Sequence, residues 1–200
     1  GAALAEAARS LGRGPSGRRE ALEALLAGWA AQEGLEALPD TRTPPRMILF
    51  DPDFAHSGDP RIWHQHFLPS EGLEHRPLSP AGGFTVANAR RGHLYQLFEA
   101  QPGDFHLAAL EVDTRQSASG EVYLRIDYFD ASMRPLGRSR RARIAPVAEF
   151  GQRQTVHALG RAPEGAVTGR ALVRFYEMDP GTRAEVHRVT VFRLPSKAIP

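Results

Sequence analysis

The sequence contains no cysteine, which excludes disulfide bonds, thiolate metal sites and a thiol nucleophile. It has no apolar segment near the roughly 20 residues that a membrane-spanning helix needs, so we expect no membrane insertion. Lysine is almost missing, because Lys197 is the single lysine among 25 basic residues. With 23 acidic residues the formal net charge is only +2, and this balance does not favour nucleic acid as a partner.

Familiar catalytic motifs are missing as well. The sequence has no Gly-x-Ser-x-Gly elbow and no phosphate-binding P-loop. A glycoside hydrolase needs two carboxyl groups that face each other across a cleft, and Asp127 with Glu177 is the kind of pair that a β-sandwich supplies by chance. We therefore predict a protein that is not an enzyme, without catalytic residues and without a cofactor.

The N-terminal part of the chain has a helical pattern. Residues 1–40 consist largely of Ala, Leu, Glu and Arg, which are strong helix formers. One apolar stripe with the helical spacing i, i+3, i+4, i+7 consists of Leu22, Leu25, Leu26 and Trp29. The proline-rich residues 40–45 cannot continue a helix. The sequence therefore predicts a helical extension that docks on the next domain, self-associates with another copy, or links an upstream domain.

From residue 46 onward the pattern alternates between apolar and polar side chains, which is typical of β-strands. Short runs rich in Val, Ile, Tyr and Phe are separated by clusters of Gly, Pro, Asp and Ser. The expected strands are 47–50, 62–66, 83–88, 93–99, 104–113, 121–129, 142–144, 152–159, 168–177 and 184–192. About ten strands without an intervening helix favour a mainly β fold, an antiparallel β-sandwich over residues 46–195.

The clearest strand alternates along its whole length. Its core-facing side chains are predicted to be Val122, Leu124, Ile126 and Tyr128. Its other side, which we expect to be solvated or to carry a ligand, consists of Tyr123, Arg125, Asp127 and Phe129. The segment 171–178 alternates in the same way, with Ala171, Val173 and Phe175 opposed to Leu172, Arg174 and Tyr176. Residues 130–134 have the composition of a hairpin turn.

Several short segments follow one another in a distinctive order. They are Ile48-Leu49-Phe50-Asp51-Pro52-Asp53-Phe54, Trp63, Leu94-Tyr95-Gln96, Gln101-Pro102-Gly103-Asp104-Phe105, Tyr123-Leu124-Arg125-Ile126-Asp127-Tyr128-Phe129-Asp130, Ala162-Pro163-Glu164-Gly165-Ala166 and Val173-Arg174-Phe175-Tyr176. This order resembles the carbohydrate-binding modules of the galactose-binding-like jelly-roll superfamily, over roughly three quarters of the chain. The resemblance implies an antiparallel jelly-roll β-sandwich that binds a glycan and does no chemistry on it. Trp63 is expected in the core.

A sugar-binding face needs aromatic rings that stack on sugars and planar side chains that bind hydroxyl groups. If the two alternating strands lie in one sheet, both kinds of side chain meet on its outer side. The predicted ligand-binding residues are Tyr123, Arg125, Asp127, Arg174, Tyr176 and Gln96. The expected partner is a polysaccharide or cell-surface glycan, an acidic one included, and an extracellular or cell-surface location is favoured. The alternative is a structural or oligomerisation module of a larger surface protein, enzyme or phage-like fibre.

Basic side chains gather in one stretch of the sequence, which contains Arg134, Arg138, Arg140, Arg141 and Arg143. Either they keep a hairpin and an edge strand solvated, or they contact an acidic polysaccharide.

Metal binding is not expected. The family that the chain resembles has a structural calcium site with a carboxylate from the last strand, and His187 stands where that aspartate would be. Imidazole serves calcium poorly. His64 and His66 would share one face of a strand, but the sequence supplies no third ligand for zinc at a recognisable spacing.

Overall fold

The computed structural model describes residues 26–28, 45–56, 59, 61–78, 82–115, 120–144, 153–178 and 180–194. Nearly all of the regular structure in these residues is β-strand. The strands are β1 (Arg46–Met47), β2 (His64–Phe67), β3 (Glu74–Pro77), β4 (Phe84–Ala87), β5 (Arg91–Glu99), β6 (Phe105–Arg115), β7 (Glu121–Phe129), β8 (Pro135–Arg138), β9 (Ala142–Arg143), β10 (Arg153–Arg161), β11 (Thr168–Tyr176) and β12 (Arg183–Leu194).

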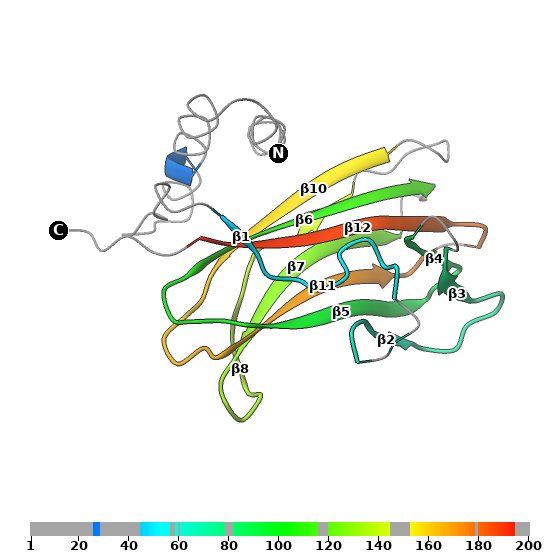
Figure 1. Cartoon of the computed structure of the whole chain (residues 1–200). Helices are drawn as coiled ribbons and strands as arrows, with labels where there is room; N and C mark the ends of the chain where they lie inside the picture. Colours follow the sequence, from blue (N-terminus) through cyan, green and yellow to red (C-terminus); the bar gives the residue numbers. More distant parts are fainter. Residues whose placement is uncertain are drawn as a thin grey trace.

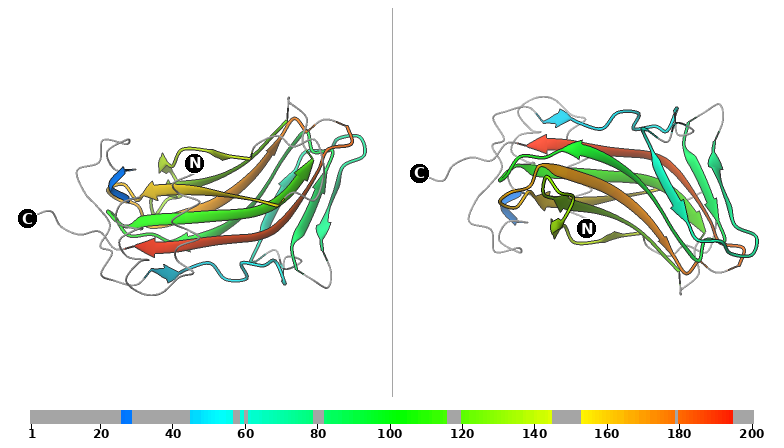
Figure 2. Two further views of the ribbon diagram at one scale, coloured as in Figure 1. Left: turned by 90° about the horizontal axis from the view of Figure 1, so that it is seen from above. Right: turned by 90° about the horizontal axis from the view of Figure 1, so that it is seen from below.

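The strands form two antiparallel sheets that face each other as curved layers (Figure 1, Figure 2). The β12 sheet has the order β10-β6-β12-β4-β3, and β1 also pairs with β12. The β11 sheet has the order β2-β5-β11-β7-β8, and β9 also pairs with β7. From β4 to β7, and again from β10 to β12, consecutive strands alternate between the two sheets. This is the connectivity of a jelly-roll β-sandwich, as the sequence predicts.

The core lies between the sheets and is built from alternate residues of each strand. On β7, Val122, Leu124 and Ile126 are fully buried, and Tyr128 is 1% exposed. On β11, which pairs with β7, the inward side chains of Val173 and Phe175 are fully buried too. The predicted core face of both strands is therefore confirmed.

Trp63 belongs to the same core. It is fully buried, its ring stacks on Phe54 with 4.2 Å between ring centroids, and its indole Nε1 donates a hydrogen bond to the carbonyl of Asp51 at 2.9 Å. Because the polar end of the ring has a partner, the whole indole can be buried at little cost. This agrees with the core position expected from the sequence.

Two strands were not expected from the sequence, namely β3 and β8. Each lies at the edge of its sheet, each contains a proline, and their side chains are mostly exposed. A strand that has one neighbour and no buried face needs no alternating pattern, so the sequence carries little signal for it. The expected turn between β7 and β8 is confirmed, since the amide of Asp130 donates to the carbonyl of Arg134 at 3.0 Å.

Most of the predicted N-terminal extension, Trp29 included, lies outside the described residues. Residues 26–28 are helical, and the side chain of Leu26, a member of the apolar stripe, is 1% exposed. Among the described residues no helix has the length and apolar character needed to cross a bilayer.

Candidate ligand-binding face

The side chains on the outer face of the β11 sheet are arranged in rows, because residues opposite each other on neighbouring strands point to the same side of the sheet. Reading across β5, β11 and β7, the rows are Arg91–Tyr176–Glu121, His93–Arg174–Tyr123, Tyr95–Leu172–Arg125 and Leu97–Arg170–Asp127. On the β2 side, His66 lies opposite His93 and His64 opposite Tyr95. The structure thus brings Tyr123, Arg125, Asp127, Arg174 and Tyr176 together on one face.

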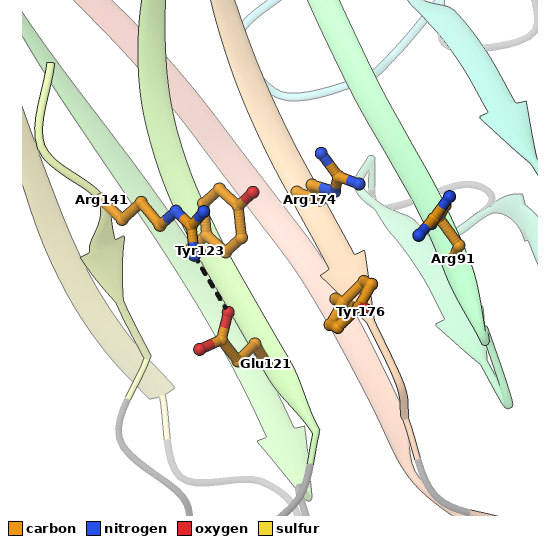
Figure 3. Close-up of a pocket in the computed structure, with 6 residues that line it drawn as sticks. All are labelled: Arg91, Glu121, Tyr123, Arg141, Arg174 and Tyr176. Atoms are coloured by element: carbon orange, nitrogen blue, oxygen red, sulfur yellow. Dashed lines mark ion pairs between the residues drawn. The ribbon is translucent and has the colours of Figure 1, made fainter. Parts of the chain in front are cut away.

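A hollow of about 470 Å³ lies at one end of this face (Figure 3). Its walls are Arg91, Glu121, Tyr123, Arg141, Arg174 and Tyr176. The volume falls within the range of roughly 300 to 1,000 Å³ that is usual for small-molecule sites. Three of the predicted ligand-binding residues therefore line one hollow. Arg91 and Glu121 were not predicted, and only the strand register, which sequence does not show, places them opposite Tyr176.

Arginine side chains lie against both tyrosine rings of the hollow. The guanidinium carbons of Arg91 and Arg174 are 5.6 and 5.8 Å from the ring centre of Tyr176. The guanidinium carbon of Arg141 is 5.0 Å from the ring centre of Tyr123. Such cation–π contacts hold the guanidinium groups in place without neutralising their charge.

The part of the face away from the hollow, around Arg125, Asp127 and Arg170, is an ion-pair network rather than a solvated surface. Asp127 is 2.6 Å from the Nε of Arg125 and 2.6 Å from a terminal nitrogen of Arg170. Tyr123, Arg125 and Asp127 are only 2%, 8% and 5% exposed, so this side of β7 is buried beneath its neighbours. Of the two alternatives expected for this side, the solvated one is corrected, because Arg141 lies over the Tyr123 ring and Arg170 of β11 binds Asp127.

Histidines continue the face toward β2. The rings of His64 and Tyr95 are stacked with centroids 4.6 Å apart, and the ring centroids of His66 and His93 are 5.2 Å apart. Burial, with added repulsion from His66 and from the arginines 170 and 174, lowers the pKa of His93 from 6.5 to about 4. His93 is therefore neutral near pH 7 and can act as a hydrogen-bond donor or acceptor.

Gln96 is separated from the other predicted site residues. It lies opposite Ala171, which belongs to the core face of β11, and it is 5% exposed. Its amide group bonds the backbone of Phe50 twice, accepting from the N–H at 2.8 Å and donating to the carbonyl at 3.1 Å. Its placement beside Tyr123 and Arg174 is thus corrected, because the period of two along β5 turns it inward. Gln96 fixes the segment before β2 to the sheet.

Most of the basic cluster that the sequence contains is paired with carboxylates. Arg134 binds Asp130 within the β7–β8 turn, with 2.8 Å between nitrogen and oxygen. Arg141 and Arg143 lie 3.7 and 3.1 Å from the carboxylate of Glu121. The cluster as a whole is therefore not an open cationic patch, although Arg141 contributes to the hollow.

The pair Asp127 and Glu177 does not form a catalytic dyad. Asp127 lies opposite Arg170 near one end of β11, and Glu177 follows the other end of the same strand. Asp127 is also occupied by two arginines.

On the outer face of the β12 sheet, Asp113, Glu185 and His187 are the single group within the described residues that could hold a metal ion. Their ligand atoms lie within 4.8 Å of one another, and His187 Nε2 is 3.0 Å from Asp113. Both carboxylates already have cationic neighbours, since Arg153 is 3.7 Å from Asp113 and Arg183 is 3.0 Å from Glu185. A metal would have to displace these interactions.

No model of a known protein family matches the sequence, and no curated protein matches it. Solved structures match the fold. A xylan-binding domain of carbohydrate-binding family 22 aligns with a TM-score of 0.50 at 13% identity over 78% of this chain and 100% of its own. The C-terminal family 22 module of Clostridium thermocellum Xyn10B gives 0.50 and 13% over 76% of this chain and 96% of its own.

The enzymatically active domain of tailspike protein 4 from bacteriophage CBA120 aligns with a TM-score of 0.53 at 11% identity, over 70% of this chain. The aligned part is 20% of that tailspike chain, so this chain spans about a fifth of its length. Likeness at such low identity shows the fold alone, and that fold is a jelly-roll β-sandwich.

Proposed function

We propose that this chain, whose fold is that of carbohydrate-binding modules, is a non-catalytic module that binds a polysaccharide on the outer face of the β11 sheet. The observation that carries the proposal is the hollow in which Tyr123 and Tyr176 lie beside Arg174. Tyrosine rings offer apolar faces to sugar rings, and guanidinium groups donate hydrogen bonds to hydroxyl groups. In the Clostridium thermocellum module, amino acids in a cleft have a role in ligand binding.

Five of the six predicted residues, all except Gln96, have a role in this proposal. Tyr176 and Arg174 contact the sugar, since both are partly exposed and both line the hollow. Tyr123 forms its floor, because its ring is buried under Arg141. Arg125 and Asp127 continue the face along β7, and their ion pair holds the floor rigid.

The presence of one carboxylate in the lining of the hollow supports binding without hydrolysis. Glycoside hydrolases use two carboxyl groups on opposite sides of the bond that they cleave. The residues that line the hollow include a single carboxylate, Glu121, and that carboxylate lies close to two arginines.

Retention on immobilised polysaccharides tests the proposal. We expect the protein to be retarded on at least one polysaccharide and to leave that polysaccharide's chain length unchanged. Tyr176→Ala should abolish retention with little loss of stability, because this side chain is only partly buried. The control is Leu97→Ala. Leu97 lies on β5, on the same face of the sheet as Tyr176 but outside the hollow, so this variant should still be retained.

The second candidate is a structural module of a larger fibre or surface protein, and the likeness to a bacteriophage tailspike domain favours considering it. A structural module would bind no polysaccharide. No retention of the parent protein on any polysaccharide would support the structural module instead. Equal retention of Tyr176→Ala and Leu97→Ala would show that the protein binds polysaccharide at a surface other than this hollow.

A further inference from the structure

The carboxylates of the candidate face are each shared by two arginines. Asp127 pairs with Arg125 and Arg170, and Glu121 lies close to Arg141 and Arg143. The face therefore has more guanidinium groups than carboxylates, although the whole chain is nearly neutral.

The surplus charge is concentrated in one place. Arg91 and Arg174 line the hollow and form no ion pair within the described part of the chain. Their contacts are with the ring of Tyr176, at 5.6 and 5.8 Å from its centre. Because both guanidinium groups lie beside the same ring, an anion bound next to that ring is attracted by both positive charges.

The strand register explains why these three side chains meet. Arg91 on β5 lies directly opposite Tyr176 on β11, and Arg174 precedes Tyr176 by two residues on the same face. Figure 3 shows both guanidinium groups beside the Tyr176 ring, on neighbouring strands, with Glu121 turned toward Arg141. Glu121, the carboxylate that lines this hollow, is therefore already engaged by Arg141.

From this arrangement we infer that Arg91, Tyr176 and Arg174 form a subsite for the carboxylate of a uronic acid residue within an acidic polysaccharide. A guanidinium group binds a carboxylate through two parallel hydrogen bonds, and the planar carboxylate matches its fork. The ring of Tyr176 supplies the apolar surface beside the charge. This inference rests on the proposed function and names the ligand class of the same site.

The surroundings fit an internal sugar of a chain. A second hollow of about 230 Å³ also includes Arg91 and Tyr176, and it continues past them along Leu68, Pro69, Arg90 and Glu177. The subsite thus lies where the two hollows meet, with space for neighbouring sugars on either side. The anion site differs from the basic cluster seen in the sequence, since Arg91 and Arg174 lie outside that cluster.

The experiment compares each acidic polysaccharide with its own neutral derivative. Polygalacturonate, alginate, hyaluronan and glucuronoxylan are immobilised before and after chemical reduction of their carboxyl groups, together with neutral galactan, xylan and β-glucan. Dextran sulfate serves as a sulfate-bearing arm. We expect retention on at least one of the uronate polysaccharides and a loss of roughly tenfold or more in affinity when its carboxyl groups are reduced, as charge-assisted hydrogen bonds require.

Matched variants separate the subsite from general charge attraction. Arg91→Gln and Arg174→Gln should each weaken uronate binding roughly tenfold, as expected for lost hydrogen bonds to a charged group. Arg46→Gln removes the same charge from an exposed position on β1, in the other sheet, and should leave affinity unchanged. Melting curves of all three variants should coincide with the parent's.

The possible failures are distinguishable. Retention on neutral polysaccharides that is lost in Tyr176→Ala but unaffected by carboxyl reduction would keep the proposed function and overturn the uronate subsite. Binding to dextran sulfate without binding to any uronate polysaccharide would also overturn it. If Arg46→Gln weakens binding as much as Arg174→Gln, the attraction is not localised at this subsite. No retention on any polysaccharide would reject the proposed function and the subsite together.

Discussion

Replacing Asp127 by asparagine should destabilise the fold strongly, although Asp127 lies on the outer side of its sheet. The side chain of Asp127 is 7% exposed, and those of Arg125 and Arg170 are 10% and 27% exposed. Removing one partner of a buried ion pair leaves an uncompensated charge, at a cost of about 3–5 kcal/mol. Because asparagine can still accept a hydrogen bond and Arg170 reaches water, we expect a loss of roughly 3 kcal/mol.

In a thermal melt this loss should lower Tm by roughly 6–12 °C, since 1 kcal/mol corresponds to about 2–4 °C for a domain of this size. The control is Asp53→Asn, which removes the same charge from an exposed pair with Arg188 whose side chains are 57% and 45% exposed. Exposed pairs contribute about 0–1 kcal/mol, so Tm should hardly change. Equal Tm values for Asp127→Asn and Asp53→Asn would refute the argument that the network on β7 is buried and stabilising.

Other expectations follow from burial, protonation and domain organisation. Leu124→Ala should cost about 2–5 kcal/mol in chemical denaturation, whereas Arg174→Ala on the partly exposed face should cost under about 1 kcal/mol; similar losses would mean that the strand faces are inverted. Burial lowers the pKa of His106 from 6.5 to about 4, so the unfolded chain takes up a proton that the native state refuses. The contribution of neutral His106 to the free energy of unfolding is therefore full above pH 6.5 and is lost as the pH falls toward 4, a change on the order of 3 kcal/mol. This pH dependence should be weaker in His106→Gln, and a stability of the parent that does not vary with pH would contradict the argument. Chelation by EDTA should leave Tm nearly unchanged, because the carboxylates of the Asp113 group already have cationic neighbours; a drop of roughly 10 °C reversed by added metal would show a native-state site. Deleting residues 1–40 should leave a β protein by circular dichroism, and an unfolded product would mean that the extension is part of the core.

The sequence by itself determined the local properties of the chain. The period of two along residues 122–128 identified the core face of β7, because burying one side of a strand requires apolar residues at every second position. The composition of residues 130–134 also predicted a turn, because turn-forming residues act through the conformation of their own backbone. The order of the segments indicated the jelly roll. Edge strands such as β3 were not predicted, since a strand with little buried surface needs no alternation of apolar and polar residues.

The tertiary structure decided what each outward side chain meets. Strand register placed Arg91 and Glu121 on either side of Tyr176, and no spacing within the sequence contains that pairing, because it joins three strands far apart in the chain. The neighbouring strands also buried Asp127 between two arginines. Alternation along one strand fixes only which side a residue faces. Whether side chains on that side are exposed to solvent, form ion pairs or line a pocket depends on the neighbouring strands. The packing of the whole sandwich determines which strands are neighbours.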